Sequence, residues 1–156
     1  MPLTAFQASV LALLAPQCSA ASYLAVGAAL HIGASGERYS NDLDFFHNAA
    51  DVANQSFAAD VVALRAAGYE VNTIAEHRGF VSAVVSNGGA STVLDWAHES
   101  AWRFLPLVAI SGGGVMLQPI DLAINKLVAL AIRREPRDLV DAIFADVNIL
   151  AFPALV

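Results

Sequence analysis

The sequence has one lysine, Lys126, one cysteine, Cys18, and no long apolar run. A single cysteine cannot form an internal disulfide, so the chain fits a reducing compartment and we expect a cytoplasmic protein. No apolar stretch approaches the ~18 residues that a membrane-spanning helix needs. No lysine or arginine precedes Arg38. The apolar N-terminal segment therefore lacks the basic region of a signal peptide, and we expect an amphipathic helix there, capped by Thr4 and ending before Pro16.

Positive charge is also scarce: 8 lysine and arginine residues against 14 aspartate and glutamate residues give a formal net charge of −6. Such a chain does not attract nucleic acid by bulk electrostatics, so any contact with RNA has to be local. The one basic cluster is Arg133, Arg134 and Arg137, close to Lys126 in the sequence. The four histidines have no metal-ligand spacing, and we assign them structural or surface roles, with His47 a weak exception because it follows Asp44 closely.

What the sequence has in excess is apolar residues, at 57% of the chain with a mean hydropathy of +0.58. This apolar fraction is high for a chain of this size. It indicates that part of the surface is buried against a partner or a second copy, so we expect a homo-oligomer. At 156 residues the chain is expected to be a single domain, residues 1–156, with a helical C-terminal part at residues 119–148.

The order of the expected elements indicates a mixed α/β domain. After the N-terminal helix, a strand at residues 23–26 is followed by a small-residue turn and a short helix at residues 29–32. A strand around Asp42 and Asp44 and a polar loop at 48–54 precede a helix at 56–67. Strands are expected at 69–76, 80–86 and 91–96, the last two joined by a tight Asn-Gly-Gly turn. Short strands at 105–110 and 115–117 then precede helices at 119–134 and 136–148.

The most informative stretch is residues 23–47, which ends in Asp42-Leu43-Asp44. Alternate side chains of a strand share a face, so Asp42 and Asp44 project together while Leu43 and Phe45 pack beneath. Two adjacent carboxylates repel each other unless a cation lies between them, and oxygen ligands suit Mg²⁺ or Mn²⁺. The alternative is a structural role without a metal, in a solvated turn or a helix cap, which a lone Asp-x-Asp pair has more often.

Asp95 lies in the later apolar run Thr92–Trp96. Alone it is most simply a strand-end carboxylate that faces water. Beside Asp42 and Asp44, a third acid on a neighbouring strand is what two-metal phosphoryl chemistry requires, and we favour that interpretation.

This order resembles the polymerase-beta-like nucleotidyltransferases, whose signature is hydrophobic-Gly-Gly/Ser, a spacer, and Asp-x-Asp/Glu. Here the signature reads as Gly27-Ala28, residues 29–41 and the Asp42–Asp44 pair, with Ala28 in place of the usual second Gly or Ser. A later segment resembles the abortive-infection nucleotidyltransferase toxins (the AbiEii family and the related MenT toxins). The residues that match those toxins are Lys126, Arg133, Arg137, Asp138 and Asp141 late in the chain, and Arg38, Ser40, Asp42, Leu43, Asp44 and Phe45 earlier.

The resemblance implies a polymerase-beta-like fold with a central mixed sheet flanked by helices, and a Mg²⁺-dependent transfer of a nucleoside monophosphate from a nucleoside triphosphate. Asp42, Asp44 and Asp95 would hold the metal ions. The implied phosphate contacts are Gly27, Ala28, Arg38 and Ser40, with Lys126, Arg133, Arg137 and Asp138 completing the site. The acceptor would be RNA (tRNA) or protein, and the biological role that of a toxin in a type IV toxin–antitoxin pair, with an antitoxin as a further partner.

Two rival functions remain open. An Asp-x-Asp glycosyltransferase also holds a nucleotide diphosphate through a metal, although the short spacing from Gly27 and the third acid argue against it. A non-catalytic nucleotide-binding or assembly module of the same fold is favoured by Ala28 and the apolar composition. The late cluster also has a bland alternative, a solvated helix surface with ion pairs such as Arg134–Asp138 or Arg137–Asp141.

Overall fold

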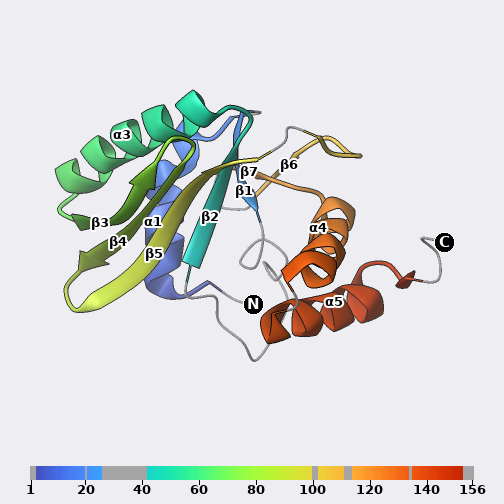
Figure 1. Cartoon of the computed structure of the whole chain (residues 1–156). Helices are drawn as coiled ribbons and strands as arrows, with labels where there is room; N and C mark the ends of the chain where they lie inside the picture. The colour runs from blue at the N-terminus through green and yellow to red at the C-terminus, as the bar shows by residue number, and fades with distance from the viewer. Residues whose placement is uncertain are drawn as a thin grey trace.

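The computed structural model describes residues 3–19, 21–25, 42–99, 102–110, 114–133 and 135–152. Within these ranges seven strands form a mixed sheet with the order β3-β4-β5-β2-β1-β7-β6 (Figure 1). The strands are β1 (Ser22–Ala25), β2 (Asp42–His47), β3 (Glu70–His77), β4 (Phe80–Asn87), β5 (Ala90–His98), β6 (Val108–Ala109) and β7 (Val115–Met116). The helices are α1 (Ala5–Leu14), the 3₁₀ turn η1 (Ala15–Gln17), α3 (Ala50–Ala66), α4 (Pro119–Arg133) and α5 (Pro136–Asn148).

The sheet is mixed because β2–β5 and β1–β7 are parallel pairs, whereas the other neighbouring strands are antiparallel. Helices α1 and α3 pack on one face of the sheet, and α4 packs on α5 (Figure 1). The expected central mixed sheet flanked by helices is therefore confirmed.

Helix α1 begins where the sequence predicts. The Thr4 hydroxyl accepts a hydrogen bond from the Gln7 N–H at 3.1 Å, and the Gln7 side chain accepts one from the Thr4 N–H at 3.0 Å. This reciprocal pair satisfies two backbone donors that the first turn of a helix otherwise leaves open. Pro16 lies in the 3₁₀ turn that follows.

The tight turn between β4 and β5 is also confirmed. Asn87 pairs with Ala90, and the two residues between them, Gly88 and Gly89, have φ angles of 59° and 86°. A two-residue hairpin with positive φ at both positions strongly favours glycine, and its twist matches that of the flanking strands.

The expected polar loop at residues 48–54 is wrong for most of its length, because α3 already begins at Ala50. Ala53 is completely buried in the first turns of this helix. Alanine is the best helix former, so the small residues at 49, 50 and 53 outweigh the polar ones around them. The helix ends as expected before Gly68, whose φ is 86°.

The expected strand at 105–110 is reduced to Val108–Ala109. Its first part is not a strand because the Asp121 carboxylate accepts hydrogen bonds from the N–H groups of Phe104 (2.8 Å) and Leu105 (3.1 Å). These N–H groups therefore donate to a side chain in the first turn of α4 and not to a neighbouring strand. The expected short helix at 29–32 lies outside the described residues.

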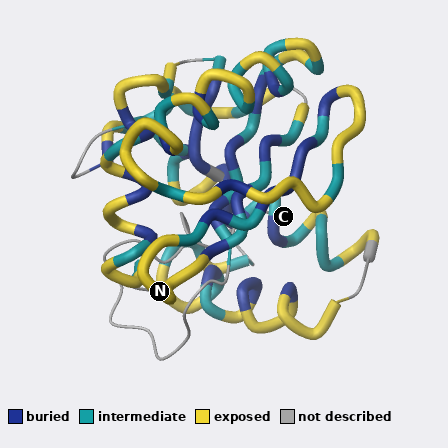
Figure 2. Tube along the Cα trace, turned by 90° about the vertical axis from the view of Figure 1, so that its left-hand side faces the viewer, coloured by how far each residue is buried: buried dark blue, intermediate teal, exposed yellow. Residues whose placement is uncertain are grey.

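The core lies between the sheet and helices α1 and α3. Its largest fully buried side chains include Trp96 and Phe45, whereas Tyr23, which is paired with Phe46, is buried on the other face of the sheet. Figure 2 shows buried strands running through the middle of the molecule, with exposed residues on the outer turns of the helices. In the described part of the chain, no helix combines the length and the apolar character needed to span a membrane.

Candidate active site

Strand β2 separates its side chains into an apolar face and an acidic face. Leu43, Phe45 and His47 are buried against the α1–α3 side, whereas Asp42 and Asp44 are half-buried on the opposite side. The prediction that the two carboxylates project together from a strand whose apolar residues pack beneath is confirmed.

Strand β5 brings the third acid beside the first two. The parallel pairing of β2 with β5 sets Asp44 directly opposite Asp95, and Asp42 opposite Val93. Residues paired across a ladder present their side chains on the same face of the sheet. Asp44 and Asp95, about fifty residues apart in the sequence, thus lie side by side in the middle of the sheet.

The row continues onto β4, where Ser82 is paired with Asp95. The Ser82 hydroxyl donates a hydrogen bond of 2.5 Å to Oδ1 of Asp95. Ser82, Asp95 and Asp44 therefore follow one another across three adjacent strands. We call these residues together with Asp42 the acid row.

Crowding of negative charge has a marked effect on Asp44. Burial raises the pKa of this carboxyl group to about 7, and the charges of Asp42 and Asp95 add to the increase. Lys126 and Arg137 act in the opposite direction. Asp44 is thus the member of the row whose ionisation is most costly, and a cation bound beside it would lower that cost.

Asp95 is affected in the same direction. Burial raises the pKa of Asp95, the hydrogen bond from Ser82 lowers it, and the charge of Asp42 raises it. Ser82 therefore stabilises the charged form of Asp95 and directs one of its oxygens toward β4.

Helices α4 and α5 contribute a buried ion pair. Lys126 Nζ lies 2.7 Å from Oδ2 of Asp141, and the two side chains are 5% and 4% exposed. Asp138, one turn earlier on α5, is completely buried. Burial of Lys126, Asp138 and Asp141 argues against the alternative interpretation of the late cluster as a solvated helix surface.

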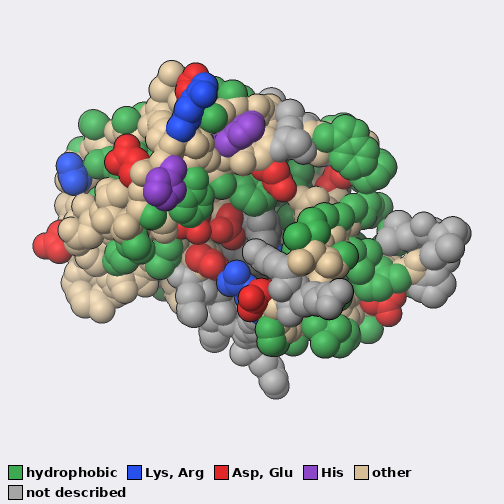
Figure 3. All heavy atoms as spheres, in the orientation of Figure 1, with side chains coloured by type: hydrophobic (Ala, Val, Ile, Leu, Met, Phe, Trp, Pro, Cys, Tyr) green, Lys and Arg blue, Asp and Glu red, His purple; other side chains and the backbone are tan. Residues whose placement is uncertain are grey.

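Arg137 is exposed at the start of α5, yet its charge reaches Asp44. Because Lys126 also acts on Asp44, α4 and α5 approach the acidic face of the sheet rather than the α1–α3 face. Figure 3 shows acidic side chains gathered with a basic one in a hollow near the centre of this face.

A pocket of about 290 Å³ lies beside Lys126. It is lined by Phe46, Glu99, Asn125, Lys126, Val128, Ala129 and Ile132. Phe46 follows Asp42 and Asp44 on the same face of β2, so the pocket lies along the strand that carries the acids. Its combination of apolar walls and a few polar groups is typical of sites for small molecules.

Five predicted site residues lie beyond what the structure describes. Gly27, Ala28, Arg38 and Ser40 fall within residues 26–41, outside the described ranges, and only the backbone of Arg133 is described. Their expected contacts with phosphate stay predictions.

The metal site also stays a prediction. The donor set of the acid row, carboxylate and hydroxyl oxygens, is of the kind that Mg²⁺ prefers. Across the described ranges, however, no three or more Asp, Glu, His or Cys side chains are placed so that they could hold a metal ion. In this arrangement Oδ1 of Asp95 accepts the hydrogen bond from Ser82.

Two solved structures have the same fold as this chain. The chain superposes on JHP933 from Helicobacter pylori with a TM-score of 0.64 at 19% identity, over 95% of this chain and 69% of that one. It also superposes on a "putative nucleotidyltransferase" from H. pylori with a TM-score of 0.62 at 18% identity, over 90% of this chain and 67% of that one. The chain has the fold of these two proteins. No family model and no curated protein matches its sequence.

At this level of identity the H. pylori structures support the predicted fold and leave the AbiEii and MenT assignment as a prediction. Ser82 is a site residue that the sequence analysis did not identify, although the sequence contains a signal for it. The Asn-Gly-Gly turn sets the pairing of β4 with β5, and counting outward from Asn87 and Ala90 places Ser82 opposite Asp95.

Proposed function

We propose that this chain is a Mg²⁺-dependent nucleotidyltransferase that moves a nucleoside monophosphate from a nucleoside triphosphate to an acceptor. The observation that carries the proposal is the acid row, in which Asp44 and Asp95 are paired across two parallel strands with Asp42 on the same face. The two H. pylori proteins with the same fold add support, because one of them is described as a "putative nucleotidyltransferase".

In this proposal Asp42, Asp44 and Asp95 hold the metal ions. When bound, Mg²⁺ would offset the negative charge that builds up as the pyrophosphate leaves. Asp95 would exchange its hydrogen bond with Ser82 for the ion. Ser82 is then a positioning residue, which holds Asp95 and stabilises its charged form before the ion binds.

The positive groups of α4 and α5 serve the phosphates. Lys126 and Arg137 already act on the charge of Asp44, so their fields extend over the place where a triphosphate would lie. Gly27, Ala28, Arg38 and Ser40 are proposed to hold the phosphates, with Arg133 and Asp138 completing the site. The reaction then depends on positioning and electrostatics, with no covalent enzyme intermediate.

The biological role proposed is that of a toxin of a type IV toxin–antitoxin system, acting on RNA (tRNA) or on a protein. It rests on the resemblance of the late cluster to AbiEii and MenT toxins. Exposed apolar side chains on α4 and α5, among them Ile132, Ile143 and Val147, support a protein partner, either an antitoxin or a second copy of this chain.

One observation favours a second candidate, a non-catalytic nucleotide-binding or assembly module. Asp141 neutralises the charge of Lys126 in a buried pair, which is what a purely structural ion pair between two helices looks like. The glycosyltransferase alternative is weakened by Asp95, since an Asp-x-Asp pair that serves a nucleotide diphosphate does not require this third acid.

The deciding experiment supplies each α-³²P-labelled nucleoside triphosphate in turn, with Mg²⁺ and with total RNA or the purified protein as acceptor. Transfer of label by the wild type, loss of transfer in Asp44→Asn and retention in Asp51→Asn would support the enzyme. Asp51 is a suitable control because it is an exposed acid on helix α3 that pairs with Arg78 on the surface, and α3 packs on the face of the sheet opposite the acid row. Nucleotide binding without transfer to any acceptor would favour the non-catalytic module.

A further inference from the structure

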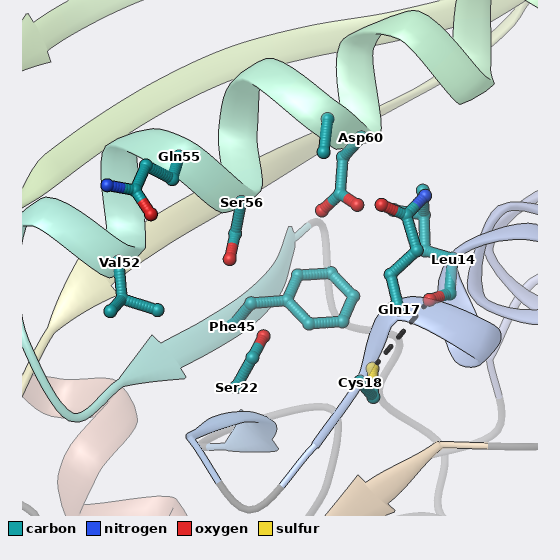
Figure 4. Close-up of a pocket in the computed structure, with 10 residues that line it drawn as sticks. Leu14, Gln17, Cys18, Ser22, Phe45, Val52, Gln55, Ser56 and Asp60 are labelled. Atoms are coloured by element: carbon teal, nitrogen blue, oxygen red, sulfur yellow. Dashed lines mark hydrogen bonds between the residues drawn. The ribbon is translucent and has the colours of Figure 1, made fainter.

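A second pocket lies on the other side of the sheet from the acid row. It has a volume of about 380 Å³ and is enclosed by α3, the segment after α1, and strands β1 and β2. Figure 4 shows Asp60 and Ser56 pointing from α3 toward the ring of Phe45, with Gln17 at the same end as Asp60. Phe45 comes from β2, whose acidic residues face the opposite side, so the sheet itself separates the two sites.

Asp60 is the unusual member of this pocket. It is 5% exposed, and one of its oxygens, Oδ2, accepts a hydrogen bond of 2.7 Å from the Trp96 indole N–H. The other oxygen, Oδ1, is buried and has no hydrogen-bond partner among the described residues. A buried carboxylate oxygen without a partner is costly, and because the side chain of Asp60 is aimed into the pocket, this oxygen indicates a missing donor there.

The missing donor is expected to carry a positive charge. No lysine, arginine or histidine is among the described residues that line the pocket. Burial raises the pKa of Asp60 to about 6, and the bond from Trp96 acts against this increase. Near pH 7.5 the group is therefore mostly ionised, and a buried negative charge is stabilised far more by a cation than by a neutral donor.

The remaining walls favour an organic cation over a bare metal ion. Among the lining residues that the structure describes, Asp60 is the only carboxylate, and the other polar groups are amides, hydroxyls and one thiol. Leu14, Phe45 and Val52 provide apolar surface for a carbon skeleton. The ring of Phe45 can also attract a cation through its face. The volume exceeds what a single ion needs and falls in the range of small-molecule sites.

We infer that this pocket binds a small organic molecule with a protonated amine, held by Oδ1 of Asp60. The amine would donate to Asp60 and to the neighbouring amide and hydroxyl oxygens, while its carbon chain lies against Phe45. This inference does not depend on the proposed nucleotidyltransferase activity.

The test uses n-butylamine as the probe at pH 7.5, with n-butanol and KCl as matched probes that lack the charge or the carbon chain. Binding to the full chain is measured by ligand-observed NMR and by the shift in thermal midpoint. We expect butylamine to bind the wild type at millimolar concentrations and to bind Asp60→Asn at least tenfold more weakly. Asp51→Asn, which removes an exposed acid from the same helix, should behave as the wild type does.

A second variant, Ala59→Phe, keeps Asp60 and fills the pocket from an exposed position on α3. It should also lose binding, and it decides the question if Asp60→Asn does not fold. Equal binding of butanol, equal binding by the Ala59→Phe variant, or an equal stabilisation by KCl alone would each overturn the inference. So would the absence of butylamine binding to the wild type. Nucleotidyl transfer is not among the readouts, so failure here leaves the proposed function untouched.

Discussion

Replacing Asp44 by asparagine should make the protein more stable at neutral pH, at the expense of its proposed activity. The pKa of Asp44 is about 7 in the folded protein, against an ordinary value of 3.8. The folded state therefore holds this proton more tightly than the unfolded state does. The stabilisation that results is complete below about pH 4 and is lost as the pH rises through 7.

The size of the effect follows from the shift. Each unit of pKa corresponds to about 1.36 kcal/mol, so moving from 3.8 to about 7 gives a penalty of roughly 4 kcal/mol once Asp44 is ionised. Relaxation and water entry around a partly buried group reduce such figures, and we expect about 2–4 kcal/mol. For a chain of this size that is a rise in thermal midpoint on the order of 5–10 °C for Asp44→Asn at pH 8.

The assay is urea unfolding of the wild type, Asp44→Asn and Asp51→Asn at pH 8 and pH 4, in the presence of EDTA. The gain of Asp44→Asn over the wild type should be present at pH 8 and nearly vanish at pH 4, where the wild-type carboxyl is protonated. Asp60 titrates in both proteins and cancels from the difference. In a separate series without EDTA, Mg²⁺ with nucleotide should stabilise the wild type at pH 8 and leave Asp44→Asn unchanged. A variant no more stable than the wild type at pH 8 would refute the electrostatic reasoning.

Three further predictions follow from other contacts. Lys126→Ala should destabilise the fold by about 3–5 kcal/mol in urea unfolding, because it removes the buried cation that neutralises Asp141. An exposed lysine would give a much smaller loss, and a change under ~1 kcal/mol would contradict the buried pair. Ser82→Ala should raise the pKa of Asp95, which ¹³C NMR of the carboxyl carbon measures; an unchanged pKa would mean that the hydrogen bond has no effect. Sedimentation equilibrium should find a dimer or larger species that Ile132→Asp or Ile143→Asp weakens, whereas a monomeric wild type would disprove self-association.

The parts of the fold that the sequence predicted are those set by local chemistry. The Thr4 cap begins α1, the glycine pair after Asn87 closes the β4–β5 hairpin, and Pro119 opens α4. Each of these signals acts within a few residues of the chain. The beginning of α3 was missed for the converse reason, because no side chain caps it at Ala49 and its placement depends on burial of Ala53.

Within the candidate site, alternation along β2 predicted the common face of Asp42 and Asp44, since a strand has a fixed period of two. The pairing of Asp44 with Asp95 was proposed from chemistry and is set by the register of β2 with β5, which no local signal encodes. Burial of Lys126 was missed because a lone lysine in an apolar helix is normally exposed. Only the position of Asp141 on the next helix explains it.

The parallel pairing of β2 with β5 also has a consequence for how the chain folds. Strands β3, β4 and β5 are consecutive neighbours in the sheet, so they can associate through short connections, whereas β2 joins β5 across a long stretch of chain. Contacts between distant segments form late, because the entropy of closing the loop must be lost first. The step that joins β2 to β5 is also the step that brings Asp44 and Asp95 together. Repulsion between the two carboxylates therefore opposes the pairing of β2 with β5. A cation that reduces this repulsion would favour folding before it takes part in any reaction.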